Sequence, residues 1–71
     1  MNDLFDVVIF ELETHRVDSV IGKGMKREGR YNSAETRLDT VLGRLNERYC
    51  AAIVPAGKYD KGSTLAAEDI S

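Results

Sequence analysis

The stretch Asp6-Val-Val-Ile-Phe-Glu-Leu-Glu13 decides the fold of this chain. It packs β-branched and aromatic residues together without glycine or proline, which is typical of a β-strand. Both faces of the strand are apolar. Phe5, Val7 and Ile9 point to one face, and Val8, Phe10 and Leu12 point to the other. A strand of this kind is covered on both sides, so we expect it at the centre of a sheet.

Two weaker apolar stretches are predicted as further strands. Residues 17–25 contain two glycines and several polar residues, a composition that suits an edge strand. Only residues 14–16 separate this strand from the first, so the two form an antiparallel hairpin. Residues 50–54 are a short apolar run that ends where Pro55 lacks a backbone donor.

Residues 33–48 are predicted as one amphipathic helix between the second and third strands. Apolar residues recur there at helical spacing, which places them in one stripe. The stripe consists of Ala34, Leu38, Val41, Leu42, Leu45 and Tyr49. Asn32 or Ser33 supplies the N-terminal cap.

These elements predict an α+β fold with a two-layer ββαβ architecture. The crossover through the helix sets the third strand parallel to the second, and the first strand fills the gap. We therefore expect a three-stranded antiparallel sheet of order 2-1-3 with one amphipathic helix packed on one face. Residues 58–63 are predicted as either turns or a short fourth strand. A single domain spans residues 1–63, and a flexible acidic tail follows at 64–71.

Composition limits the functional classes. The chain has 71 residues, 42% hydrophobic and 31% charged, with a net charge of −2, as in an ordinary soluble globular domain. The one cysteine, Cys50, cannot form an internal disulfide, and neither a CxxC pair nor a Cys/His cluster is present. We expect no metal and no cofactor. The apolar runs are too short for a membrane span, so a membrane partner is excluded and a cytoplasmic location is expected.

One face of the predicted sheet has no second helix to cover it, and it carries either Phe5, Val7 and Ile9 or Val8, Phe10 and Leu12. An exposed apolar patch of this kind usually marks a partner surface. We therefore predict a non-catalytic protein-interaction or regulatory module, an accessory protein of a bacterium or phage, that forms a homodimer through this sheet face. The predicted contact residues are the apolar Phe5, Val7 and Ile9 with Arg37, Arg44 and Arg48 as polar anchors.

The alternative hypothesis is an accessory protein that binds nucleic acid or phosphate. Residues 22–30 are rich in glycine and basic side chains and lie just before the helix N-terminus, where free amides and the helix dipole favour an anion. The candidate residues are Lys23, Lys26, Arg27 and Arg30. The net negative charge of the chain argues against this hypothesis.

A remote third hypothesis is a cysteine-dependent enzyme. Antiparallel pairing of the first and third strands brings Cys50 near Glu13, Thr14 and His15. A three-stranded sheet with one helix offers little concavity for a substrate, however. We therefore predict that the protein is not an enzyme and assign no catalytic residue.

Overall fold

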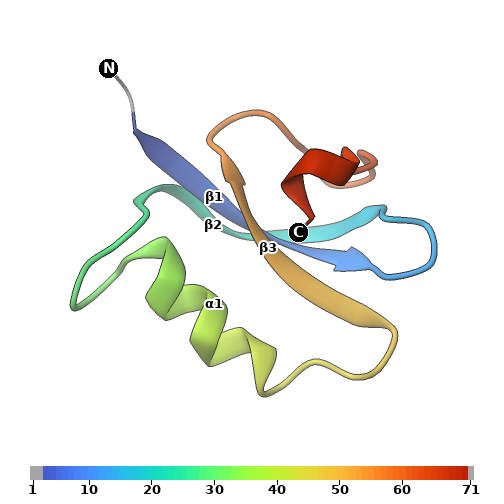
Figure 1. The fold of residues 1–71 in the computed structure, drawn as a ribbon, viewed down its shortest axis with the longest axis horizontal. Helices are drawn as coiled ribbons and strands as arrows, with labels where there is room; N and C mark the ends of the chain where they lie inside the picture. The colour runs from blue at the N-terminus through green and yellow to red at the C-terminus, as the bar shows by residue number, and fades with distance from the viewer. Residues whose placement is uncertain (1–2, 71) are drawn as a thin grey trace.

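Three strands form one antiparallel sheet of order β2-β1-β3, which confirms the predicted α+β class and strand order (Figure 1). The structure is a computed structural model that describes residues 3–70. The strands are β1 (Leu4–Glu11), β2 (Val17–Lys26) and β3 (Tyr49–Pro55). The helix α1 (Ala34–Leu42) connects β2 with β3, and the short 3-10 helix η1 (Ala67–Asp69) lies near the C-terminus.

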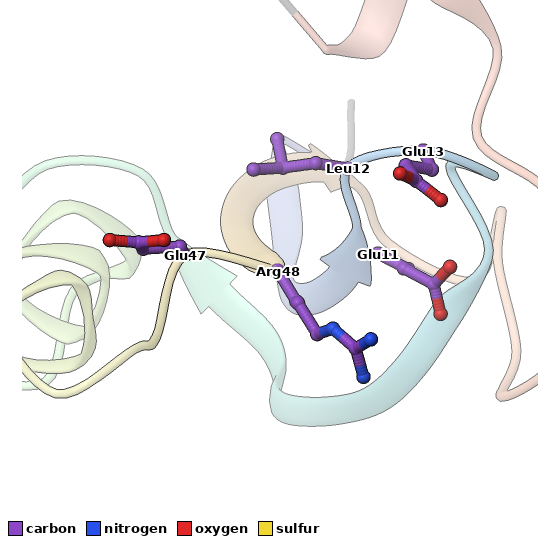
Figure 2. A pocket seen from close by; sticks show the side chains of 5 residues that line it. All are labelled: Glu11, Leu12, Glu13, Glu47 and Arg48. Atoms are coloured by element: carbon purple, nitrogen blue, oxygen red, sulfur yellow. The ribbon is translucent and has the colours of Figure 1, made fainter.

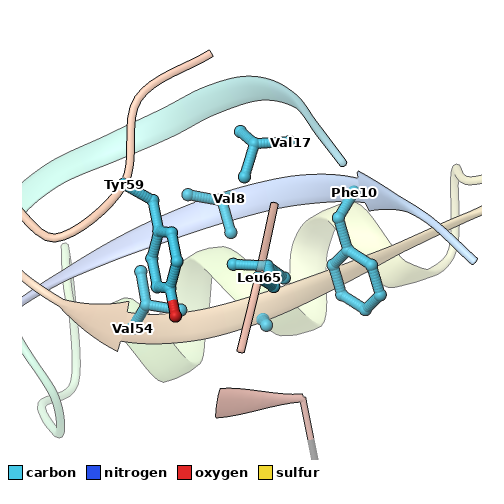
Figure 3. Packing of buried hydrophobic residues seen from close by; sticks show 7 residues of the cluster. Val8, Phe10, Val17, Val54, Tyr59 and Leu65 are labelled. Atoms are coloured by element: carbon cyan, nitrogen blue, oxygen red, sulfur yellow. The ribbon is translucent and has the colours of Figure 1, made fainter. Parts of the chain in front are cut away.

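The central strand β1 is covered on both faces, as its two apolar faces predict. Its even-numbered residues Val8 and Phe10 belong to a buried cluster with Tyr59 and Leu65 (Figure 3). Side chains alternate along a strand, so the odd-numbered residues face the other side, where α1 packs against the sheet. Val7 on that side is fully buried.

The expectation of an uncovered sheet face is wrong. After β3 the chain turns back across the sheet, and Tyr59 and Leu65 close over the Val8 side with only 7% and 4% of their surface exposed (Figure 3). In Figure 1, α1 and η1 lie on opposite sides of β3. The covering residues are too irregularly spaced to show a helical or strand period, which is why the sequence did not reveal this second layer.

Backbone hydrogen bonds fix the returning segment to the start of β2. Gly62 N donates to Val17 O at 2.8 Å, Val17 N donates to Ser63 O at 2.7 Å, and Leu65 N donates to His15 O at 2.8 Å. Residues 64–70, predicted as a flexible tail, therefore pack with the rest of the domain in the structure. Residue 71 lies outside the described residues.

Residues 58–63 form turns and bends rather than a short fourth strand. Lys58 N donates to Pro55 O at 3.2 Å and Ser63 N donates to Asp60 O at 3.0 Å, so turn bonds satisfy part of this backbone locally. One isolated antiparallel bridge follows, between Arg16 and Thr64.

The helix α1 begins where predicted but ends earlier than residue 48. Ser33 caps its N-terminus, and the Ser33 hydroxyl accepts a hydrogen bond from Thr36 N at 3.2 Å. Gly43 is the C-terminal cap. The helix ends at this residue because glycine is among the weakest helix formers. Residues 43–48 instead lead into β3, where Arg48 O accepts from Leu12 N at 2.9 Å and starts the pairing with β1.

The two outer edges of the sheet differ in regularity. Pairing between β1 and β2 shifts register three times, and each shift inserts one extra residue in β2. Such bulges twist an edge away from the flat geometry that another strand needs. By contrast, β3 pairs with β1 through seven consecutive residues in a single register.

Candidate functional site

The outer edge of β3 carries backbone groups that β1 does not use. In an antiparallel ladder, pairs that exchange hydrogen bonds alternate with pairs that do not. Leu12 N donates to Arg48 O, and at the other end of the ladder Ala56 N donates to Leu4 O at 3.2 Å. The even-numbered residues of β3 therefore bond to β1. The residues directed outward are Tyr49, Ala51, Ile53 and Pro55.

Both ends of this outer edge are partly closed within the chain, although among residues 3–70 no backbone hydrogen bond uses the Tyr49 carbonyl. At the first end, Tyr49 N donates to Asn46 O at 3.3 Å. At the other end, Pro55 has no backbone donor, and its carbonyl accepts from Lys58 N at 3.2 Å. The open part of the edge is therefore short and sharply bounded.

The centre of the edge has unused backbone groups. Ala51 and Ile53 each direct one N–H and one C=O away from β1, and among residues 3–70 no backbone hydrogen bond uses these four groups. Ala51 is only 8% exposed and Ile53 is half-buried, so these groups are recessed rather than fully open to solvent. The Cys50 thiol donates a weak bond of 3.7 Å to Ala51 O, which leaves that oxygen a second lone pair. The edge thus presents two donors and two acceptors two residues apart.

The open edge lies in a shallow groove of about 160 Å³ between α1 and the C-terminal segment. Leu38 from α1 and Ile70 from beyond η1 line its two sides. Leu42 lies one helical turn after Leu38, on the same flank of α1, and 43% of its surface is exposed. The edge is therefore bordered by apolar side chains rather than by a ring of charges.

The charges around the groove balance. No charged residue lies within β3, and the lining contains one cation and one anion, Arg27 and Asp69. The Arg27 guanidinium lies 5.5 Å from the centroid of the Phe5 ring, a cation–π contact. The Lys58 ammonium, and next the Tyr59 hydroxyl, donate to the Asp69 carboxylate and lower the pKa of Asp69.

The outer edge of β2 is occupied where β3 is open. The Arg37 guanidinium donates to Ile21 O at 3.4 Å, and residues 62–65 cover the first part of the strand. Together with the three bulges, these contacts leave β3 as the better edge for another strand.

The structure separates the predicted partner-binding residues. Phe5, Val7 and Ile9 lie on the α1 side of the sheet, and the complete burial of Val7 withdraws it from any partner surface. Arg37 and Arg44 lie together beside a hollow of about 230 Å³ between α1 and β2.

Arg48 lies away from the other two arginines because α1 ends before it. It lines a separate hollow of about 230 Å³ with Glu11, Leu12, Glu13 and Glu47 (Figure 2). The Glu47 carboxylate is directed away from those of Glu11 and Glu13, so the three acids do not converge on one point (Figure 2).

The predicted anion-binding residues do not surround a set of free amides. Lys23 and Lys26 are exposed on β2, and Arg27 and Arg30 are exposed in the following loop. The first amides of α1 are already used, because Glu35 N donates to Arg27 O at 3.0 Å and the Ser33 hydroxyl takes the Thr36 amide. The structure therefore adds no support for a phosphate at this helix N-terminus.

Cys50 and His15 both lie near Phe10, but among residues 3–70 no hydrogen bond joins the two side chains. Cys50 is half-buried against the hydrophobic cluster. The His15 ring lies edge-on to Phe10 with the ring centroids 6.2 Å apart. Within residues 3–70, no three His, Cys, Asp or Glu side chains are grouped so that they could hold a metal ion.

No family model, curated protein or solved structure matches this chain. Among the described residues, none of the helices has the length and apolar character needed to cross a lipid bilayer.

Sequence reasoning missed the groove beside β3. Its apolar borders come from Leu38 and Ile70, which the sequence assigned to the core stripe and to a flexible tail. The available signal was the order 2-1-3, which sets the third strand at an edge, together with the absence of charge from residues 49–55.

Proposed function

We propose that this chain is a non-catalytic protein-interaction module that binds by addition of a strand along the outer edge of β3. The observation that supports it is the pair of outward-facing residues, Ala51 and Ile53, in a regular and uncharged edge. An extended segment that adds to a sheet edge gains its affinity from backbone hydrogen bonds, and flanking pockets give specificity.

The surroundings of the edge favour this function over binding to nucleic acid. The groove carries one positive and one negative charge, whereas a phosphate backbone requires several Lys or Arg residues on one face. Leu38 and Ile70 are suited to contact apolar side chains of an incoming strand. We place the module in the cytoplasm, where its single cysteine stays reduced.

The substitution Ala51→Pro tests this function. It removes one outward donor and fills its place with the proline ring, and it breaks no ladder bond because the Ala51 N–H is not bonded to β1. Ala51→Ser is the matched control because it keeps the backbone donor. Each protein is immobilised and exposed to extract of the native cell. We expect partners that bind the native protein and Ala51→Ser and are lost with Ala51→Pro.

Circular dichroism and thermal unfolding establish that both variants are folded before capture is compared. Partners retained equally by the native protein and a folded Ala51→Pro variant would overturn strand addition at β3. Captured partners that are released by added salt, and that are lost when Lys23 or Lys26 is replaced, would favour the nucleic-acid alternative instead.

A further inference from the structure

We infer that the occupant of the β3 edge is β3 of a second copy of this chain, paired antiparallel about a two-fold axis at Ala52. The inference rests on the proposed function and names the partner of the same edge. The pairing joins two three-stranded sheets into one continuous sheet, with both α1 helices on the same side. The edge is complementary to the same edge of a second chain in its hydrogen-bonding groups, in its side chains and in its charges.

The open backbone groups are self-complementary. With the axis at Ala52, Ala51 lies opposite Ile53 of the second copy, and Ile53 lies opposite Ala51. Each of these two pairs exchanges two hydrogen bonds, so all four open groups of each chain are satisfied. At the ends, Tyr49 lies opposite Pro55. The Pro55 carbonyl is already bonded to Lys58 N, and because Pro55 has no N–H, the Tyr49 carbonyl gains no bond from this pairing.

The register follows from the bounds of the strand. β3 runs from Tyr49 to Pro55, and Ala52 is its midpoint, so this alignment pairs the whole strand. An axis at Ala51 would pair only residues 49–53. The alignment also sets Ala52 opposite its own copy in a pair without hydrogen bonds, where the two Cα atoms approach to about 4.5 Å. Alanine is small enough for that approach.

The side chains beside the edge also suit a second copy. Continuing the sheet brings the Leu38 and Leu42 flank of α1 toward the same flank of the other α1. This contact covers Leu42, which is half-exposed in the single chain. Because α1 packs across all three strands, its body is not confined to the region above β3, and the flanking leucines can fill the space between the helices.

Charge favours a copy of this chain over a strongly charged partner. The strand has no charged residue, so two copies meet without like charges along the paired backbone. Arg27 and Asp69 at the borders of the groove have opposite signs. A two-fold contact therefore repeats a balanced pair on both sides rather than doubling one sign.

Light scattering coupled to size exclusion, together with sedimentation equilibrium over a range of concentrations, tests this inference. We expect the native chain to reach twice its single-chain mass of 7.9 kDa. Ala51→Pro should weaken dimerisation at least about tenfold, whereas Ala51→Ser should not. A dimer that persists unchanged in folded Ala51→Pro would overturn the location at β3.

A second pair of variants tests the apolar flank without touching the strand. Leu42→Lys brings two like charges together across the axis, and Leu12→Lys is matched because Leu12 and Leu42 are 45% and 43% exposed. We expect Leu42→Lys to weaken the dimer at least about tenfold and Leu12→Lys to leave it unchanged. Equal effects of the two substitutions would contradict the arrangement of the helices.

Disulfide trapping tests the register. In a Cys50→Ala background, Ala52→Cys sets two thiols opposite each other at a separation that a disulfide spans, whereas Ala51→Cys does not. We expect oxidation to cross-link the first variant as a dimer and to leave the second uncross-linked. The reverse result would overturn the Ala52 axis.

A further outcome separates this inference from the proposed function. A native chain that stays a 7.9 kDa monomer at all concentrations up to about millimolar, a Kd that corresponds to about 4 kcal/mol, would overturn self-pairing. If Ala51→Pro still abolished binding to a different protein, strand addition at β3 would stand with another occupant.

Discussion

Asp6 connects two distant turns to the centre of the sheet. It is only 3% exposed, and its two carboxylate oxygens accept hydrogen bonds from Gly24 N at 2.9 Å and Gly57 N at 3.0 Å. Both glycines have positive φ, 60° and 77°, a conformation that glycine adopts without steric cost. One buried acceptor group therefore positions a bend in β2 and the turn after β3.

We predict that Asp6→Asn lowers the free energy of unfolding by about 1–3 kcal/mol. The amide keeps one acceptor, but its NH2 group must face one of the two glycine N–H groups, which leaves that N–H and the buried NH2 without an acceptor. Urea denaturation measures the difference. Asp18→Asn is the control, because Asp18 is exposed and its substitution should change stability by less than about 0.5 kcal/mol. Equal stability of the two variants would contradict this role of Asp6.

Contacts of this kind are beyond sequence reasoning at the level of single residues. The two glycines are 18 and 51 positions from Asp6, so no local pattern connects them to it. The sequence showed Asp6 only as a polar residue at the start of an apolar strand. The alternation that follows it, by contrast, predicted the two covered faces of β1, because side-chain direction in a strand follows the local period of two.

The helix α1 shows where local and tertiary requirements compete. Its apolar stripe predicted residues 33–48, yet the helix ends at Leu42 and Gly43. The stripe identified the helix and its inward side. It did not show that the residues after Leu42 are needed to connect the helix to the start of β3, where β3 must lie in register with β1. A glycine within the predicted helix was the available sign of an earlier end.

Gly43 is also a place where the helix can be strengthened. Its φ of −72° and ψ of −8° suit any residue, and a Cβ there meets no other atom within 4 Å. We predict that Gly43→Ala raises the free energy of unfolding by about 0.4–1 kcal/mol, because it restricts the unfolded chain at no cost to the folded one. Urea denaturation followed by circular dichroism measures the change.

Gly57→Ala is the matched control for this prediction. It also meets open space, but its φ of 77° lies in the left-handed region, where a side chain costs roughly 1–2 kcal/mol. We therefore expect the two alanine substitutions to change stability in opposite directions. A stabilising Gly57→Ala would mean that backbone conformation does not decide the effect.

At the scale of the whole molecule, the C-terminal segment completes the core and is fastened by one polar cluster. Lys58 Nζ donates to Asp69 at 2.8 Å and to Glu68 at 3.3 Å, and the Tyr59 hydroxyl donates to Asp69 as well. The carboxylates of Asp69 and then Glu68 raise the pKa of Lys58, while the hydrogen bonds from Lys58 and Tyr59 lower the pKa of Asp69.

These shifts predict how closure of the segment depends on pH. The pKa of Asp69 is lowered on folding, so its contribution is present above the ordinary value of about 3.9 and is lost as pH falls through the lower folded value. The pKa of Lys58 is raised, so its contribution is present below about 10.4 and is lost as pH rises through the folded value. The segment should be most firmly closed between these limits.

Hydrogen exchange of the Leu65 and Ile70 amides, followed by NMR between pH 7 and pH 2, measures this dependence. Exchange rates are corrected for the intrinsic effect of pH. In the native protein we expect protection to fall below about pH 4. In Asp69→Asn the acid-dependent loss should be smaller, because the titrating group is gone. Parallel curves for the two proteins would show that other carboxyl groups govern the opening.

The sequence predicted the architecture of the molecule and missed its second covering layer for one physical reason. Strand alternation and helical period are local, so three strands, their order and one helix followed from them. The second layer is built by Tyr59, Leu65 and Ile70 in a segment with no period. Without that layer one face of the sheet was expected to be bare, and the predicted binding surface was placed on it.

The three bulges of β2 limit the size of the assembly that the proposed pairing would build. A sheet with two regular edges grows without limit, because every added subunit presents a new edge to the next, as in amyloid fibres. In this chain the β2 edge is bulged and partly covered by other residues. A pair joined through β3 therefore has only the two irregular β2 edges at its ends. Growth of the proposed pair would therefore stop at two chains, and polymerisation would require that β2 first be straightened.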